Sequence, residues 1–180
     1  MSFSFHSSFI LRKLIIKDYN LKLIILKSKS MNWTKYFYNI AQVVKEKSKD
    51  HNTKIGAVIV GKDKEIVSTG YNSFPRGIND EVIERQEKPE KYFWFEHAER
   101  NAIYNAARIG VSTKGCTMYL TCDIPCADCA RGIINAGIVK VYFMKKGGAH
   151  SQKWKDSGER SMQMFKEAGV EIEPYDFNKK

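Results

Sequence analysis

The run GAVIV at residues 56–60 sets the architecture of this 180-residue chain, because five small or aliphatic side chains in a row are typical of a buried strand. The segment GKDK at 61–64 predicts a turn, and IVSTGY at 66–71 predicts the hairpin partner of the strand. Ahead of the strand, residues 33–48 predict a helix whose apolar stripe is formed by Trp33, Phe37, Ile40, Ala41 and Val44.

Strands and helices alternate through the rest of the chain. Residues 72–95 predict an irregular segment, and a loop of this length in a compact domain is usually functional. Beyond it we predict helices at 97–109, 126–136 and 157–168, and strands at 117–121, 139–143 and 170–173. This order indicates an α/β fold of three layers, αβα, around a central mixed sheet of about five strands.

The composition indicates one globular domain. A hydrophobic fraction of 43% with 12% aromatic residues is enough to build a core, which excludes a disordered chain. No run approaches the roughly 18–20 apolar residues of a membrane helix, so we expect no membrane partner. Four cysteines are too few for a disulfide-rich scaffold, and we expect a cytoplasmic protein.

The formal charge of +10 is concentrated at one end of the chain. Residues 1–30 hold six basic groups and one acidic group, which is half of the excess. We interpret residues 1–30 as a basic leader, disordered or non-native, followed by a domain at 31–180. A secretory signal and a mitochondrial-type presequence are the alternatives, although Arg12 and Lys13 interrupt the apolar run that a secretory signal needs.

Two short segments carry metal-binding chemistry, HAE at 97–99 and PCADC at 125–129. Cys126 and Cys129 lie three residues apart at a helix start, so their thiols point the same way, and the positive end of the helix favours the thiolate form. With His97 they make three ligands, the number that a catalytic Zn²⁺ site uses while its fourth position stays open. Glu99 lies close enough to that position to move a proton, and we predict it as the catalytic residue.

Other interpretations of the cysteines remain open. A C-x-x-C pair can be redox-active or can belong to a structural zinc site, for which Cys122 would be the fourth ligand. We expect Cys116 and Cys122 to be packed thiols instead. A carboxylate such as Glu99 beside an open metal position gives a structural site no advantage, so it favours catalysis over a non-catalytic zinc module.

The pattern H-x-E … P-C-x-x-C is the signature of zinc-dependent nucleobase deaminases. Further segments resemble the deoxycytidylate (dCMP) deaminase family of the cytidine deaminase-like superfamily, over about Trp33 to Val170. They are SKD at 48–50, GAVIV at 56–60, GYNSFPRG at 70–77, HAERNAI at 97–103 and AGI at 136–138. The zinc motif is shared by the whole superfamily, whereas the segment at 70–77 points more specifically to dCMP.

The resemblance implies an enzyme, a hydrolase acting on the C–N bond of a cyclic amidine. It would convert dCMP to dUMP and ammonia and so supply dUMP for thymidylate synthesis. It also implies that Asn72 contacts the sugar hydroxyl, that the backbone N–H of Ala98 binds the pyrimidine carbonyl, and that the enzyme is a homo-oligomer. In regulated members the segment at 70–77 is associated with dCTP and dTTP effectors; Ser73 stands where members often have Gly, so effector regulation stays open.

The remaining substrate contacts are predicted from residue type. Candidate cations for a phosphate are Arg76, Arg100, Lys145 and Lys146. Candidates for stacking on the base are Trp94, Phe95 and Tyr142. The alternative function is a deaminase of a base in tRNA or another polynucleotide, which the overall charge favours. The acidic residues just before the HAE segment would repel a phosphate backbone, which favours a free nucleotide; they are Glu81, Glu84, Glu87 and Glu90.

Overall fold

The computed structural model describes residues 31–144 and 152–175. All five residues of β1 (Gly56–Val60) are buried, as the run GAVIV predicts. The sheet has the order β2-β1-β3-β4-β5, with β2 at Ile66–Tyr71, β3 at Thr117–Leu120, β4 at Lys140–Met144 and β5 at Glu171–Tyr175. β1 is antiparallel to both of its neighbours, whereas β3, β4 and β5 run parallel. The prediction of a five-stranded mixed sheet is confirmed.

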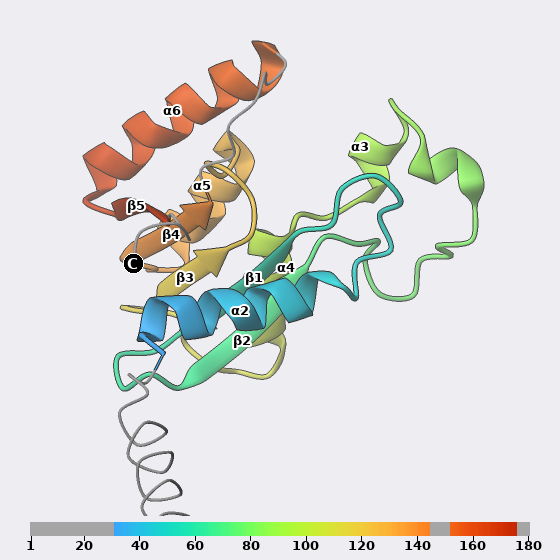
Figure 1. The fold of residues 1–180 in the computed structure, drawn as a ribbon. Helices are drawn as coiled ribbons and strands as arrows, with labels where there is room; N and C mark the ends of the chain where they lie inside the picture. Colours follow the sequence, from blue (N-terminus) through green and yellow to red (C-terminus); the bar gives the residue numbers. More distant parts are fainter. Residues whose placement is uncertain (1–30, 145–151, 176–180) are drawn as a thin grey trace, which may run out of the picture. The chain divides into compact units, whose positions relative to one another are not determined.

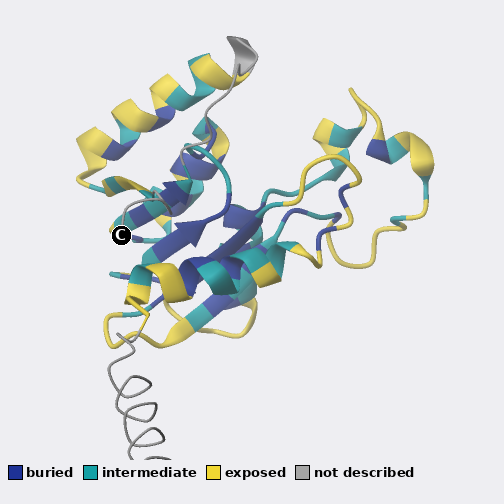
Figure 2. Ribbon diagram, viewed as in Figure 1, coloured by how far each residue is buried: buried dark blue, intermediate teal, exposed yellow. Residues whose placement is uncertain are grey.

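Helices cover both faces of this sheet (Figure 1). On one face α2 (Trp33–Lys45) packs Phe37 and Ala41 against Val58 of β1. On the other face Ile59 belongs to a larger cluster with residues of three helices, α4 (Ala98–Arg108), α5 (Ala127–Asn135) and α6 (Gln152–Ala168). The central strands are correspondingly the most deeply buried part of the fold (Figure 2). The predicted three layers are therefore confirmed.

The α2 stripe differs from the prediction at its first turn. Trp33 is 55% exposed and stacks on the outer side of Phe37, with ring centroids 5.6 Å apart. Tyr38 is buried in its place, and its hydroxyl donates a hydrogen bond to Met144 Sδ at 2.8 Å. The polar tip of Tyr38 thus finds a partner on β4, which a periodicity of apolar residues does not anticipate.

The irregular segment after β2 contains two short helical turns, η1 (Ile83–Gln86) and α3 (Lys91–Trp94). Its two ends meet, because Ser73 and Glu96 exchange backbone hydrogen bonds of 3.1 and 2.8 Å. We call residues 74–95 the insert and this pair of hydrogen bonds its neck. Glu96 directly precedes His97, so the neck holds the chain in place just before the metal-binding motif.

Gly70 allows α4 to lie directly on β2. A Cβ atom at Gly70 would stand 2.3 Å from the backbone N of Ala102 and 2.4 Å from the carbonyl O of Ala98. No side chain fits in that space, and the backbone atoms of a helix cannot move aside independently. The glycine therefore sets the depth at which α4 holds the residues at its N-terminus.

The predicted leader at 1–30 lies outside the described residues, as do Lys145 and Lys146. Within the described ranges, we find no helix with the length and apolar character that a membrane span requires.

Candidate active site

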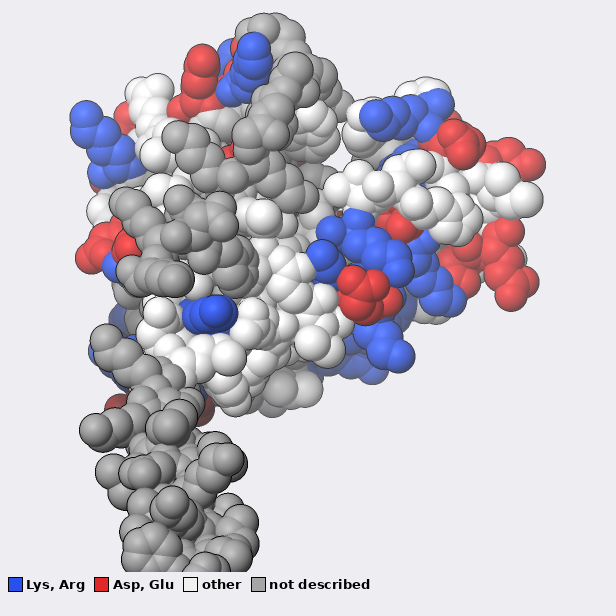
Figure 3. Space-filling model, in the orientation of Figure 1, with Lys and Arg blue, Asp and Glu red and all other residues white. Residues whose placement is uncertain are grey.

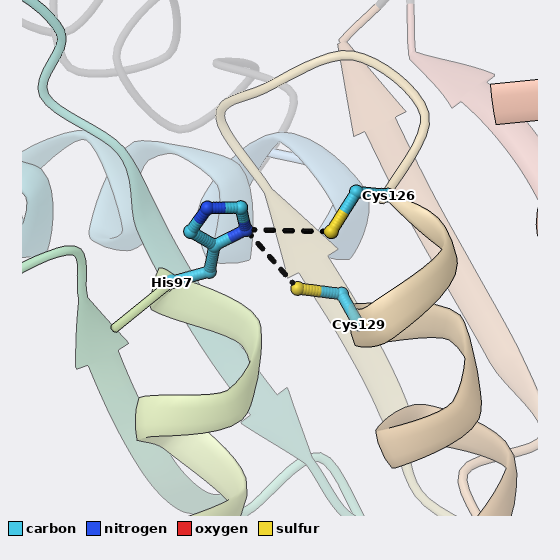
Figure 4. A group of neighbouring side chains, drawn as sticks. All are labelled: His97, Cys126 and Cys129. Carbon is cyan, nitrogen blue, oxygen red and sulfur yellow. Dashed lines mark hydrogen bonds between the residues drawn. The ribbon is translucent and has the colours of Figure 1, made fainter. Parts of the chain in front are cut away.

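Three metal-ligating side chains meet at the N-terminal ends of two helices. His97 is the N-cap of α4, Cys126 is the N-cap of α5, and Cys129 lies in the first turn of α5. His97 Nδ1 lies 3.5 Å from Cys126 Sγ and 3.4 Å from Cys129 Sγ (Figure 4). The three donor atoms lie within 4.8 Å of one another. The structure thus brings together the three residues that the spacing predicts as ligands.

Glu99 lies beside this group on the first turn of α4 and is only 3% exposed. Burial raises the pKa of its carboxyl group, although His97 opposes this rise. A carboxyl with a raised pKa can both take up and release a proton near neutral pH. We refer to His97, Glu99, Cys126 and Cys129 together as the metal corner.

The other two cysteines differ in position. Cys116 is 5% exposed and packs in the core, as expected. Cys122 is only half-buried, lines the cavity described below, and has its Sγ 3.9 Å from Glu99 Oε1. The prediction of a packed thiol is therefore incomplete for Cys122, because β3 ends at Leu120 and the chain then turns toward the metal corner.

The side chains of the metal corner shift one another's pKa values. A hydrogen bond with Cys129 lowers the pKa of Cys126 to about 4, although burial opposes this change. A hydrogen bond with Cys126 raises the pKa of His97 to about 9, and the pKa of Cys129 is raised by the neighbouring thiolate and by burial. At neutral pH these shifts correspond to a Cys126 thiolate beside a protonated His97 and a Cys129 thiol. An imidazole nitrogen and two sulfurs at this spacing fit a zinc ion, which takes nitrogen and thiolate ligands.

The metal corner opens onto a cavity of about 740 Å³. This volume is in the range of roughly 300–1,000 Å³ that is usual for small-molecule sites. His97, Glu99 and Cys126 stand on its wall. The remaining lining residues are Asp50, Thr53, Ile55, Asn72, Lys88, Lys91, Tyr92, Phe95, Cys122, Asp123, Ile124, Trp154, Lys155, Gly158, Glu159 and Met162.

Some of the predicted substrate contacts lie at this cavity. Asn72 is 5% exposed and forms part of its wall. Phe95, a predicted stacking residue, also lines it. Ala98 is fully buried and is the first residue of α4, between His97 and Glu99. Backbone N–H groups at a helix start have no partner within the helix, so the Ala98 N–H is available for such a contact by its position.

Other predicted contacts lie elsewhere. The Arg76 guanidinium donates to Asn105 Oδ1 at 2.6 Å beside a separate cavity of about 220 Å³. Arg100 pairs with Glu96, one helical turn earlier, through its Nε at 2.6 Å from Oε1. Neither arginine lines the cavity of the metal corner.

The aromatic residues predicted to stack on the base also lie in different parts of the fold. Tyr142 stacks on Tyr119, with centroids 4.9 Å apart, and packs with the cluster under α2 on the opposite face of the sheet. Trp94 lies under the Arg85 guanidinium and donates to Glu90. Tyr142 therefore lies on the face of the sheet opposite the metal corner and does not line its cavity, unlike Phe95.

Most residues of the cavity wall were not predicted, among them Lys88, Lys91, Trp154 and Lys155. Trp154 and Lys155 belong to α6, which begins five residues before the predicted start. The Trp154 ring lies 6.2 Å from that of His97. No short motif marks these positions, because α6 reaches the metal corner only through the tertiary fold.

Acidic side chains gather over the insert on the face shown in Figure 3, with lysine and arginine side chains beside them. This arrangement matches the acidic residues predicted before the HAE segment, among them Glu84 and Glu87. Lys88 and Lys91 lie in the same stretch and line the cavity. The acidic surface of the insert would repel a long phosphate backbone, whereas the lysines of the cavity wall can meet a small anion.

Comparison with known families gives one matching model. Residues 31–145 match the model of the cytidine and deoxycytidylate deaminase zinc-binding region. This span contains β1, the insert and the whole metal corner.

Comparison with individual proteins agrees with the family match. The chain is 39% identical over 147 residues to a human deoxycytidylate deaminase, covering 78% of each chain. It is also 39% identical over 140 residues to a protein of Aliivibrio fischeri named "Uncharacterized deaminase in luxG 3'region", covering 78% of this chain and 91% of that one. Among solved structures, the dCMP deaminase of the cyanophage S-TIM5 in complex with dCMP and dUMP superimposes with a TM-score of 0.58 at 27% identity, covering 79% of this chain and 93% of that one.

Proposed function

The chain belongs to the cytidine and deoxycytidylate deaminase family, and on that premise we propose that it is a hydrolase that converts dCMP to dUMP and ammonia. The observation that carries this proposal is the metal corner, in which a buried Glu99 stands beside a His/Cys/Cys group on the wall of a nucleotide-sized cavity. The reaction supplies dUMP for thymidylate synthesis.

We assign zinc to the metal corner, held by His97, Cys126 and Cys129. When bound by such a set of ligands, zinc makes water acidic enough to supply hydroxide near neutral pH. Both cysteines start α5, where the helix dipole stabilises thiolate charge. Glu99 is left free of ligation, so its carboxyl group remains available for proton transfer.

Glu99 moves the protons of the reaction. Its carboxylate accepts a proton from water and delivers it to the ring nitrogen next to the carbon that carries the amino group. A second proton passes through Glu99 to the departing amine, which leaves as ammonia while oxygen from water stays on the ring. The raised pKa of Glu99 supports this role, because the same carboxyl must hold a proton and then give it up.

The residues around the metal corner support a free nucleotide as substrate. Asn72 on the cavity wall is assigned to the sugar hydroxyl, and the Ala98 N–H to the pyrimidine carbonyl. Lys88 and Lys155 line the same cavity from the insert and from α6, and they are better placed for the 5′-phosphate than Arg76 or Arg100. The names of the human relative and of the cyanophage complex, which contain deoxycytidylate and dCMP, agree with this substrate.

Four further assignments complete the proposal. Residues 31–180 form the catalytic domain, since the family match begins at residue 31. We assign the enzyme to the cytoplasm, where cysteine thiols such as those of Cys126 and Cys129 stay reduced. We also propose that it works as a homo-oligomer. Control by dCTP and dTTP is proposed as an added property, with Ser73 at the neck of the insert as the position to examine.

The test is ammonia release from dCMP, dCTP, deoxycytidine and a tRNA anticodon stem, each with and without added dCTP and dTTP. We expect dCMP to be the best substrate. Activity on the RNA alone would overturn the substrate assignment.

Glu99→Gln is the decisive variant for the mechanism. It keeps the size and hydrogen-bonding shape of the side chain but cannot carry the proton, so we expect kcat to fall by about 10²–10⁴-fold. Zinc content, measured by atomic spectroscopy, should stay at the wild-type value. A variant with near-normal turnover would remove Glu99 from the proton-transfer role.

A further inference from the structure

A buried ion pair joins the insert to the cavity wall. Lys91 of α3 places its Nζ 2.6 Å from Asp50 Oδ1, and the two side chains are only 13% and 4% exposed. Lysine is rarely buried unless its charge is matched. Both residues line the cavity of the metal corner. The charge of Lys91 is thus committed to Asp50 at the edge of the substrate site.

Asp50 also forms a hydrogen bond with Asn72, so it links Lys91 to that residue. Its Oδ2 accepts a hydrogen bond from Asn72 Nδ2 at 3.0 Å. Its Oδ1 also accepts from the backbone N–H groups of Asn52 at 2.8 Å and Thr53 at 2.9 Å. The backbone N–H groups of the loop therefore already fix the orientation of the Asp50 carboxylate to which Lys91 bonds. That carboxylate in turn orients the side-chain amide of Asn72.

The amide of Asn72 is fixed at both of its ends. Its Nδ2 donates to the carbonyl of Thr53 at 2.7 Å, as well as to Asp50. Its Oδ1 accepts from the Ile55 backbone N–H at 2.7 Å. The Ser48 hydroxyl, which has a single proton, lies 2.8 Å from this oxygen and 2.7 Å from the Asn72 carbonyl oxygen. When Ser48 donates to the carbonyl, Oδ1 keeps one lone pair for the sugar hydroxyl. These partners allow only one orientation of the amide, because a backbone N–H can only donate and a carbonyl can only accept.

Four members of this network form one side of the cavity, and we call them the polar wall: Asp50, Thr53, Ile55 and Asn72. None of the hydrogen bonds found among the described residues joins Lys91 to His97 or to Glu99. Lys91 therefore acts on the polar wall and not directly on the metal corner. A second contact supports this attachment of the insert, since Gln86 is buried and donates to the Lys49 carbonyl at 3.3 Å.

We propose that Lys91 is a positioning residue that, through Asp50, holds Asn72 at the polar wall and so sets the affinity for the nucleotide. The proposal rests on the proposed function, because it names the part of that same site on which nucleotide affinity depends. It assigns binding to the insert and its ion pair, and leaves the chemical step to the metal corner.

The test compares Lys91→Met with the wild-type enzyme. Methionine keeps most of the length of the side chain but leaves Asp50 without its cation. We expect KM for dCMP to rise by about 10-fold or more, the effect of losing one hydrogen bond to a charged group. We expect kcat and zinc content to change little. Lys91→Arg, which keeps the charge, should recover part of the lost affinity.

The double variant Lys91→Met/Asp50→Asn tests whether the effect passes through Asp50. The fold rise in its KM should be smaller than the product of the rises in the two single variants, because both changes break the same ion pair. The matched control is Lys140→Met, which removes a paired lysine far from the cavity; Lys140 Nζ lies 2.8 Å from Glu173 Oε2. KM in this control should equal that of the wild type.

A measurement without substrate separates this proposal from the proposed function. In Lys91→Met the side-chain amide protons of Asn72, followed by NMR, should exchange with water faster than in the wild type. A wild-type enzyme inactive on dCMP would refute the proposed function, while the exchange comparison would still decide the positioning role. Unchanged exchange of Asn72, or an unchanged KM in Lys91→Met, overturns the proposal. If Lys91→Met does not fold, Lys91→Arg carries the same comparison, with a smaller expected rise in KM.

Discussion

The metal corner and the polar wall face the same cavity but are built in different ways. The metal corner consists of side chains on the first turns of two helices that are packed against a fully buried strand. The polar wall consists of loop residues held by hydrogen bonds and by one buried ion pair to the insert. The difference indicates that rigid elements place the reacting groups, whereas loops tied by polar contacts recognise the rest of the substrate.

Removal of a metal ligand should have the largest effect on zinc binding and turnover at the metal corner. In Cys129→Ala we expect zinc to be lost and turnover to fall by more than the roughly 10–100-fold effect of removing an outer partner of a metal ligand. Metal analysis and ammonia release measure both. Cys116→Ala is the control, because Cys116 is a buried thiol outside the site and should leave zinc bound. Full zinc binding in Cys129→Ala would contradict the assigned ligand set.

A substitution on β2 that displaces α4 should also disturb the metal corner, because α4 carries His97 and Glu99 at its N-terminal end. In Gly70→Ala the new methyl group meets the α4 backbone, so we expect a loss of about 1–3 kcal/mol in the free energy of unfolding and weaker zinc binding. Urea unfolding and zinc titration measure the two effects. In the control Gly132→Ala on α5, the nearest atom is 3.5 Å from the new Cβ, so stability should stay the same or rise. A fully stable Gly70→Ala would show that α4 can shift freely.

The polar wall should be sensitive to acid. Burial by itself raises the pKa of Asp50, but the hydrogen bonds from Lys91, Thr53 and Asn52 outweigh it, and the pKa is lowered from 3.8. A lowered pKa stabilises the fold above the unfolded value of 3.8, and this contribution is lost as the pH falls through the folded value.

Asp50→Asn tests this pH dependence. We expect the variant to be less stable than the wild type at pH 7 and to lose less stability between pH 5 and acid conditions. Urea unfolding across that pH range gives the comparison, with Asp63→Asn in the exposed turn after β1 as the control. Equal acid sensitivity of Asp50→Asn and the wild type would argue against a stabilising Asp50–Lys91 pair.

The smallest effect is expected for Tyr142→Phe. Tyr142 belongs to neither region, since it packs on the opposite face of the sheet. We expect kcat/KM for dCMP to stay within about 2-fold of the wild type and stability within about 0.5 kcal/mol. A clear rise in KM for this variant would indicate that Tyr142 contacts the substrate.

The two regions also differ in how far the sequence predicts them. The metal ligands could be predicted because each stands at a helix start, where local rules on spacing and dipoles apply. The pair Asp50–Lys91 joins residues 41 positions apart, and only the tertiary fold shows that they meet. Tyr142 was misplaced because its neighbours on β4 are also apolar, so alternation does not indicate which face it takes. Arg100 pairs with Glu96, which precedes the N-cap of α4, so the spacing of side chains within a helix does not by itself predict this pair.

The neck between Ser73 and Glu96 makes the insert modular. It is closed by backbone hydrogen bonds, which do not depend on the side chains at those positions. Side chains in the exposed part of the insert can therefore change while the neck keeps His97 in its place. For protein engineering, the same feature identifies residues 78–84 of the insert, which do not line the cavity of the metal corner, as a segment in which libraries leave Lys91 unchanged.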